Sequence, residues 1–246
     1  MKRIALFLVT LLFLPSLASA GVCNDWNALY QRIRDYRIKP AVAQQEFVKL
    51  HRQLQREFAA AGARGRVFPV VGYDAASGEK GRNYHGKGYR FFTGNPNGIH
   101  AAHDLFIHDV DQDSIDDGSG TPVTVAAFSA GVVVGVNTGW EETSAVRGGN
   151  YVWVFDPLTS RYNYYAHLQR IDVRLGQTVK AGDSLGILGR TGKNAIMPRS
   201  PTHLHFMVLA FDGGRMTPHN PWQELVSARS AENQLSAVSS QLSAKP

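Results

Sequence analysis

The chain has 246 residues and a formal net charge of +6, from 26 Lys and Arg against 20 Asp and Glu. It holds one cysteine, Cys23, so no internal disulfide supports the fold, and a chain of this length can bury a sufficient core without one. The modest charge, without any dense block of Lys and Arg, argues against nucleic-acid binding and favours approach to an anionic polymer.

The N-terminus has the three parts of a secretory signal peptide. Two basic residues precede an apolar run over residues 4–14, and small side chains follow at residues 18–20. The apolar run is too short to cross a bilayer, which needs about 20 residues. We therefore expect residues 1–20 to be a signal peptide and the mature protein to be exported without a transmembrane segment. A lipoprotein signal at Cys23 is the alternative, but Val22 stands where a lipobox has a small residue.

Residues 21–65 are predicted to form a helical N-terminal segment. Pro40 suits the first turn of a second helix, and Gly62 stands where a C-cap falls. We expect a hairpin that packs against the main domain, the commoner fate of an amphipathic helix, or one that covers the functional site as a lid. Its apolar positions at helical spacing are Trp26, Leu29, Tyr30, Ile33, Phe47, Leu50, Leu54 and Phe58.

Residues 66–222 have the pattern of a mainly β domain. Short runs rich in Val, Tyr, Phe and Thr alternate with glycine-containing turns, which predicts an antiparallel β-sandwich or barrel-like fold. Residues 223–246 are rich in Ser, Ala and Gln, and we expect a short helix followed by a partly disordered tail. The predicted strands cover residues 123–127, 131–136, 151–155, 162–166, 184–188 and 203–209.

Histidines gather in this β region, and the sharpest cluster is an H-x-H motif. On a strand, His203 and His205 face one side while Leu204 and Phe206 face the other. Two adjacent imidazoles suit a metal or an acid–base pair, although two surface histidines would explain an isolated H-x-H equally well.

Two further elements carry the same chemistry. His100 and Asp104 are four residues apart and can meet at one metal if the segment between them bends suitably, and His167 ends a predicted strand that contains Tyr165. A catalytic zinc site usually has three protein ligands from His, Asp, Glu and Cys, with water as the fourth. Each element alone is more often structural than functional.

In this order, the motifs H-x-x-x-D, Y-x-H-L and H-x-H resemble the lysostaphin-type (LytM-like) family of zinc endopeptidases, over roughly residues 68–221. Glycine-marked strands at residues 175–182 and 185–192 belong to the same pattern. The resemblance implies a duplicated hybrid motif fold and one Zn²⁺ per chain. It also implies hydrolysis of peptide bonds in peptidoglycan, at stem-peptide cross-links or bridges, by a periplasmic or secreted enzyme.

The resemblance also implies roles for individual residues. His100, Asp104 and His205 match the zinc ligands, and His167 and His203 match the catalytic residues. Tyr165, two residues before His167 and so on the same strand face, either supports an oxyanion or packs in the core.

Two local features depart from the family pattern near the first motif. Ala102 stands where the family usually has glycine, which narrows the approach of a substrate without removing a ligand. His103, adjacent to Asp104, is the alternative ligand to His100, and His108 is a further candidate.

An acidic loop over residues 108–118 is a further departure. Its aspartates echo the opening of a calcium-binding loop, but no Glu closes it at the twelfth position and Ser114 replaces the usual Gly. We favour a solvated acidic loop, with Ca²⁺ binding as the alternative. The candidate ligands are Asp109, Asp111, Asp113 and Asp117.

Two other functions compete with the peptidase. A catalytically silent relative would keep the fold and bind the cell wall or activate other wall hydrolases, but such a protein should lack ligands. A copper carrier using the H-x-H pair should bring soft Cys and Met ligands, but neither a cysteine nor a methionine cluster accompanies the motif, and Met207 alone is expected in the core.

Overall fold

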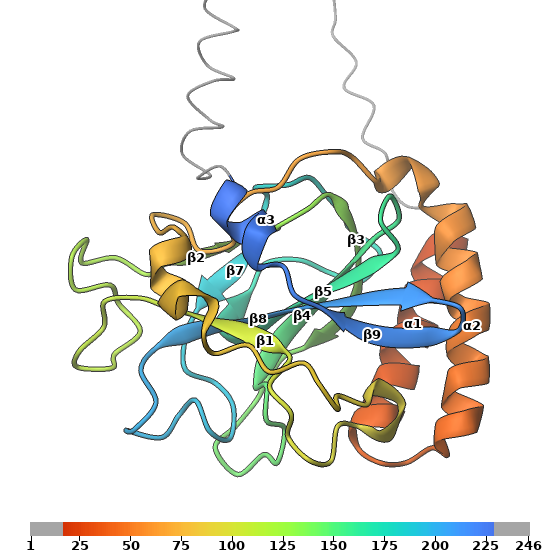
Figure 1. Ribbon diagram of the computed structural model, residues 1–246, viewed down its shortest axis with the longest axis horizontal. Helices are drawn as coiled ribbons and strands as arrows, with labels where there is room; N and C mark the ends of the chain where they lie inside the picture. The colour runs from red at the N-terminus through yellow and green to blue at the C-terminus, as the bar shows by residue number, and fades with distance from the viewer. Residues whose placement is uncertain (1–16, 229–246) are drawn as a thin grey trace, which may run out of the picture.

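The computed structural model describes residues 17–228 of the chain (Figure 1). The apolar run of the predicted signal peptide and most of the predicted C-terminal tail lie outside these residues. Within residues 17–228, no helix combines the length and the apolar character needed to cross a membrane.

Two antiparallel helices form the N-terminal hairpin, as the apolar spacing predicts. Helix α1 spans Leu17–Arg34 and α2 spans Pro40–Glu57, with Pro40 at the start of its first turn. The prediction that Gly62 caps α2 is wrong, because α2 ends at Glu57 and Gly62 has a φ of −76°. A Cβ at Gly62 would lie 2.9 Å from the backbone nitrogen of Leu158, so this glycine permits close packing instead.

Nine strands form one open antiparallel sheet in the order β1-β8-β5-β4-β3-β6, with β7 pairing with β2 and β5, and β9 with β8. The mainly β prediction is confirmed, but the sheet does not close into a barrel. All six predicted strands are present, whereas β1 and β9 were not expected because both are short and rich in polar residues. The bounds are β1 Ala102–Phe106, β2 Thr124–Ala126, β3 Gly131–Asn137, β4 Asn150–Asp156, β5 Arg161–Ile171, β6 Thr178–Val179, β7 Ser184–Leu188, β8 His203–Asp212 and β9 Arg215–His219.

Side-chain alternation gives the sheet two buried faces. Trp153 on β4 and Tyr162 on β5 face α1 and α2, and we call this the helix face. Val152, Tyr165 and Phe206 face the opposite side, the far face, where they pack against β2, β7 and the short helix α3, Trp222–Ser227. Figure 1 shows the two helices lying against one side of the sheet.

Aromatic packing fixes the hairpin to the helix face. The ring of Trp26 stacks on Tyr162 with centroids 5.5 Å apart and meets Trp153 edge-on at 5.7 Å. The side-chain oxygen of Asn27 accepts a hydrogen bond from the backbone nitrogen of Val136 at 3.2 Å. Of the two expectations for the hairpin, the structure therefore favours packing, and the helices are part of the core.

Cys23 belongs to the same packed surface. Its side chain is fully buried, and burial raises the pKa of the thiol to about 12. A buried neutral thiol behaves as a small apolar side chain, so Cys23 contributes packing rather than reactivity.

Buried His51 on α2 makes stability depend on pH. Its Nδ1 lies 2.9 Å from the hydroxyl of Tyr162, and burial lowers its pKa from 6.5 to about 4. Between these pH values the unfolded chain binds a proton that the folded chain does not, so this contribution to stability is complete above pH 6.5 and is lost as pH falls.

The free energy of unfolding of the unsubstituted protein should fall between pH 7 and pH 5. We predict that this fall is smaller by about 2 kcal/mol in His51→Gln. Urea unfolding at the two pH values measures this difference. His85→Gln, at an exposed histidine, is the matched control and should leave the pH dependence unchanged. Equal pH dependence in the unsubstituted protein and His51→Gln would contradict the assignment.

Candidate metal centre

The pairing of β1 with β8 places Asp104 directly opposite His205. The Nδ1 atom of His205 lies 3.0 Å from Oδ1 of Asp104, and the Nε2 atom of His100 lies 3.1 Å from the same oxygen. Each of the three residues offers one ligand atom, and these atoms all lie within 4.8 Å of one another. The structure thus brings together the residues that the sequence motifs single out as candidate ligands.

Backbone carbonyls fix the orientation of three imidazoles around this centre. The Nδ1 atoms of His100, His167 and His203 each lie 2.7 Å from a carbonyl oxygen, those of Asn83, Thr191 and Pro201. A carbonyl only accepts hydrogen bonds, so Nδ1 carries the proton and Nε2 of a neutral ring is left with a free lone pair. All three histidines therefore present a basic nitrogen.

His167 joins the site through a β-bulge in β5. Its φ is +71°, and it is the extra residue between Ala166 and Leu168, which pair with consecutive residues of β4. The ring of His167 lies 5.0 Å from that of His203 and 5.7 Å from that of His205, between centroids. The bulge thereby turns His167 to the helix face.

The same bulge separates Tyr165 from His167 and favours core packing over oxyanion support for Tyr165. Regular alternation would place Tyr165 and His167 on one face, but Tyr165 is buried on the far face. Its hydroxyl accepts a hydrogen bond from the backbone nitrogen of Phe128 at 2.8 Å. Tyr164 instead faces the site, with its ring 6.1 Å from that of His205, and only knowledge of the bulge would have identified it.

His103 is excluded as the alternative ligand to His100. It alternates with Asp104 along β1 and is fully buried, with Nε2 2.8 Å from the side-chain oxygen of Asn220. Ala102 is buried against the helix face. His108 lies beyond the end of β1, with its ring 5.8 Å from that of Tyr73.

Burial and charge prepare the centre for a cation. Burial opposes ionisation of Asp104, but the imidazoles of His100 and His205 outweigh it and hold its pKa well below the usual range. Burial lowers the pKa of His205 and, more strongly, that of His167, while Asp104 raises the pKa of His100 against the effect of burial. An ionised carboxylate with neutral imidazoles is the donor set that zinc prefers, so these residues fit the metal that the motifs imply.

The centre lines one cavity of about 820 Å³. Its walls come from the C-terminal end of α1, from residues within 89–101, from residues 145–148, and from residues 193–195 and Ser200. His100, Asp104, His167, His203 and His205 all line this cavity, so a bound molecule can reach the candidate ligands and the free imidazoles together.

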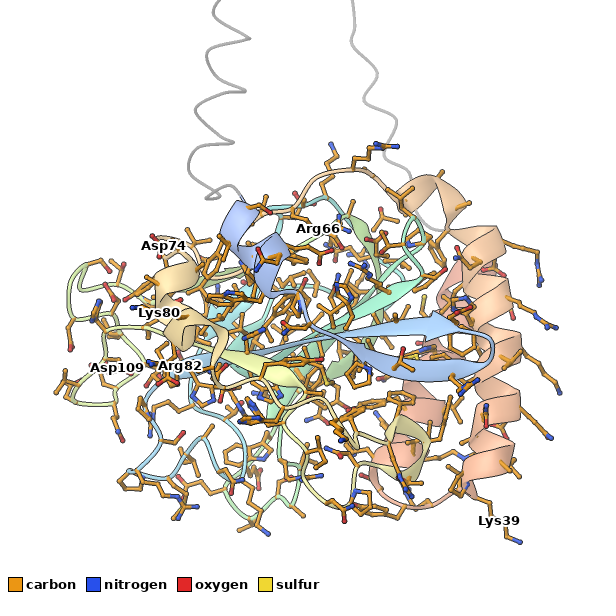
Figure 2. All side chains as sticks on the ribbon, viewed as in Figure 1. Lys39, Arg66, Asp74, Lys80, Arg82 and Asp109 are labelled. Carbon is orange, nitrogen blue, oxygen red and sulfur yellow. The ribbon has the colours of Figure 1, made fainter. Side chains whose placement is uncertain are left out.

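The acidic loop lies on the opposite side of the molecule from Lys39, the residue before α2, as Figure 2 shows. Ligand oxygens of Asp109, Asp111 and Asp117 lie within 4.8 Å of one another, and Asp113 is outside this group. The buried carboxylate of Asp109 already accepts hydrogen bonds from the backbone nitrogens of Asp113 and Ser114, at 3.1 and 3.0 Å. It also accepts from the Thr202 hydroxyl at 2.5 Å, and thus ties the loop to the start of β8. A solvated loop stays the prediction, with calcium binding as its untested alternative.

A known family matches this part of the chain. The model of peptidase family M23 matches residues 113–219, a range that includes His167, His203 and His205 and begins after His100 and Asp104. Residues 113–219 form an M23 peptidase domain.

Individual relatives agree with the M23 assignment. Lysostaphin of Staphylococcus staphylolyticus is 31% identical over 149 residues, which cover 59% of this chain and 26% of that protein. The glycyl-glycine endopeptidase ALE-1 of Staphylococcus capitis is 31% identical over 118 residues, or 48% of this chain and 29% of that protein. The match thus spans little more than a quarter of these curated relatives.

A solved M23-like structure is similar over a longer stretch. A putative glycyl-glycine endopeptidase lytM from Ruminococcus gnavus is 25% identical, with a TM-score of 0.45, and the similarity covers 89% of this chain and 88% of that one.

We predict that Asp109→Ala lowers the free energy of unfolding by about 3 kcal/mol, because three donors lose their acceptor in a buried position. Asp111→Ala removes an exposed carboxylate from the same loop and should change it by less than about 0.5 kcal/mol. Urea unfolding in calcium-free buffer compares the two variants. A large loss in Asp111→Ala as well would show that the loop is not held by Asp109 alone, and repetition with added calcium would then test the calcium alternative.

Proposed function

We propose that the protein is an exported zinc endopeptidase that hydrolyses peptide bonds of peptidoglycan. His100, Asp104 and His205 hold the metal in this proposal, and His167 and His203 are the catalytic residues. The observation that carries it is the convergence of these five side chains, from three separate segments, on one cavity. The M23 domain and the glycyl-glycine endopeptidase named among the relatives support the reaction class.

The chain's own residues supply proton transfer. Zinc held by the three ligands supplies a Lewis acid and brings the pKa of a water molecule near ~7. His203 Nε2 lies 3.6 Å from Oδ1 of Asp104, close enough to the ligands to accept a proton from the attacking water. His203, protonated in that step, can then return the proton to the leaving amine, while the neutral Nε2 of His167, whose ring lies 5.0 Å from that of His203 between centroids, can accept a hydrogen bond from the water.

Burial assists this chemistry. Burial holds the pKa of His167 well below its usual value, so its ring is neutral at neutral pH and its Nε2 can accept a hydrogen bond. Tyr164 is also buried, and its ring forms part of the cavity wall beside His205. Electrostatic interactions with the charge that develops in the transition state are stronger in a site from which most water is excluded.

The competing functions have less support. A silent relative should lack part of the ligand set, yet His100, Asp104 and His205 are all in place. A copper carrier should place soft ligands at the metal, but the sulfur of Cys23 is buried within the core formed by α1.

Metal analysis tests the ligand assignment. The protein as purified should contain about one zinc per chain, and His205→Ala and Asp104→Ala should each lose it. His203→Ala should retain zinc, and His108→Ala, at an exposed neighbouring histidine, is the control that should also retain it. Elemental analysis measures the content. An empty site in His203→Ala would reverse the assignment of ligand and catalytic residue.

Activity is tested on purified cross-linked peptidoglycan, with fragments separated by chromatography and identified by mass spectrometry. We expect peptide-bond cleavage that a chelator abolishes and added zinc restores. His203→Ala, loaded with zinc, should lower the rate roughly a hundredfold or more, because a proton-transfer group is lost. Fragments released equally with and without the metal would overturn the zinc mechanism, and no release would favour the silent relative.

A further inference from the structure

The cavity beside the candidate metal centre has a fixed wall made by the hairpin. Tyr30, Ile33 and Arg34, at the C-terminal end of α1, line it together with the histidines. Tyr30 contacts Tyr151 and Trp153 edge-on, with centroids 5.7 and 5.2 Å apart. Because these aromatic contacts are part of the core, the end of α1 is a permanent boundary of the cavity.

Two loops complete the rim next to this wall. At Gly94, where φ is +69°, an added Cβ would lie 2.9 Å from the carbonyl oxygen of Ile33, so the backbone at Gly94 fits closely against the end of α1. Nη2 of Arg147, in the connection between β3 and β4, donates a hydrogen bond to the carbonyl of Asn95 at 3.0 Å. This contact holds the Arg147 side chain at the mouth of the cavity.

The charged side chains that line the cavity differ in whether they already have a partner of opposite charge. They are three cations and two carboxylates: Arg34, Arg147, Lys193, Asp35 and Asp104.

Arg34 is already neutralised by Asp35. Its Nε and Nη2 donate to that carboxylate at 2.6 and 3.0 Å, and its Nη1 donates to the hydroxyl of Tyr151 at 2.9 Å. Asp104 is itself a candidate metal ligand, grouped with His100 and His205. Within residues 17–228, Arg147 and Lys193 form no ion pair, and both are exposed.

We propose that Arg147, with Lys193 on the adjacent segment, forms a carboxylate-binding subsite that selects substrates presenting a carboxylate near the cleaved peptide bond. This inference rests on the proposed peptidase function and deepens it by naming the substrate class. One N–H of the Arg147 guanidinium donates to the carbonyl of Asn95, and its other N–H groups can donate to a ligand. A planar guanidinium can form two parallel hydrogen bonds with a carboxylate. A peptide with free carboxylates then binds better than an uncharged glycine chain.

The subsite acts on binding rather than on proton transfer. A substrate carboxylate bound by Arg147 would fix the position of the peptide in the cavity. One peptide bond would then lie over the centre formed by Asp104 and the histidines. Loss of the contact should therefore raise KM more than it lowers kcat.

The experiment compares one substrate in two chemical forms. Cross-linked muropeptides, released from peptidoglycan by a glycosidase, are used as isolated and after conversion of their carboxyl groups to amides with carbodiimide and ammonia. The measured quantity is the ratio of kcat/KM for the carboxylate form to kcat/KM for the amide form, for the full mature chain loaded with zinc.

We expect the unsubstituted enzyme to prefer the carboxylate form, and Arg147→Gln to lower the ratio roughly tenfold, mostly through KM, as loss of a charge-assisted hydrogen bond predicts. Arg147→Lys should keep part of the preference, because it keeps the charge. Arg199→Gln removes the same charge from the neighbouring loop outside the cavity lining and should leave the ratio unchanged.

The outcomes separate this inference from the proposed function. Equal cleavage of both forms, or equal ratios in the unsubstituted enzyme and Arg147→Gln, would overturn the carboxylate subsite and leave the peptidase standing. No metal-dependent cleavage of either form by the unsubstituted enzyme would overturn the proposed function itself.

Discussion

The register between β1 and β8 is the constraint on which the rest of the site depends. It places Asp104 opposite His205, and alternation along β8 then puts His203 on the same face, two residues away. A slip of one residue would turn Asp104 toward the far face and bring His103 into the site. Burial of Leu105, the next residue of β1, in the far-face core opposes such a slip, so the packing of one face holds the chemistry of the other.

The bulge in β5 is the second device that assembles the site. A regular strand would send His167 into the far-face core, where a polar ring would need a buried partner. The left-handed backbone at His167 turns the ring toward His203, and the carbonyl of Thr191 accepts its Nδ1 proton. The alternation of side chains between the two faces of β5 is thereby shifted by one residue, and Leu168 instead of His167 packs in the far-face core.

The hairpin serves both the stability of the fold and the shape of the site. Trp26 and Phe47 are fully buried on the helix face, the face on which the histidines converge. The helix pair packs on this face, and the C-terminal end of α1 lines the same cavity as the histidines. The end of α1 thus limits how a substrate can approach, without making contact with a metal ligand.

The sequence by itself determined the two helices and six of the strands, because these follow from local periodicity, and it indicated His100, Asp104 and His205 as candidate ligands through the resemblance of three short motifs to a known family. Tertiary structure alone decided that Tyr164 rather than Tyr165 faces the cavity, that His103 points away, and that Arg147 lies at the rim. Each of these depends on strand register, a bulge or a loop contact between residues far apart in the chain. Side-chain alternation is a local rule, and one inserted residue reverses it, which is why the face of a residue after a bulge cannot be deduced from the strand before it.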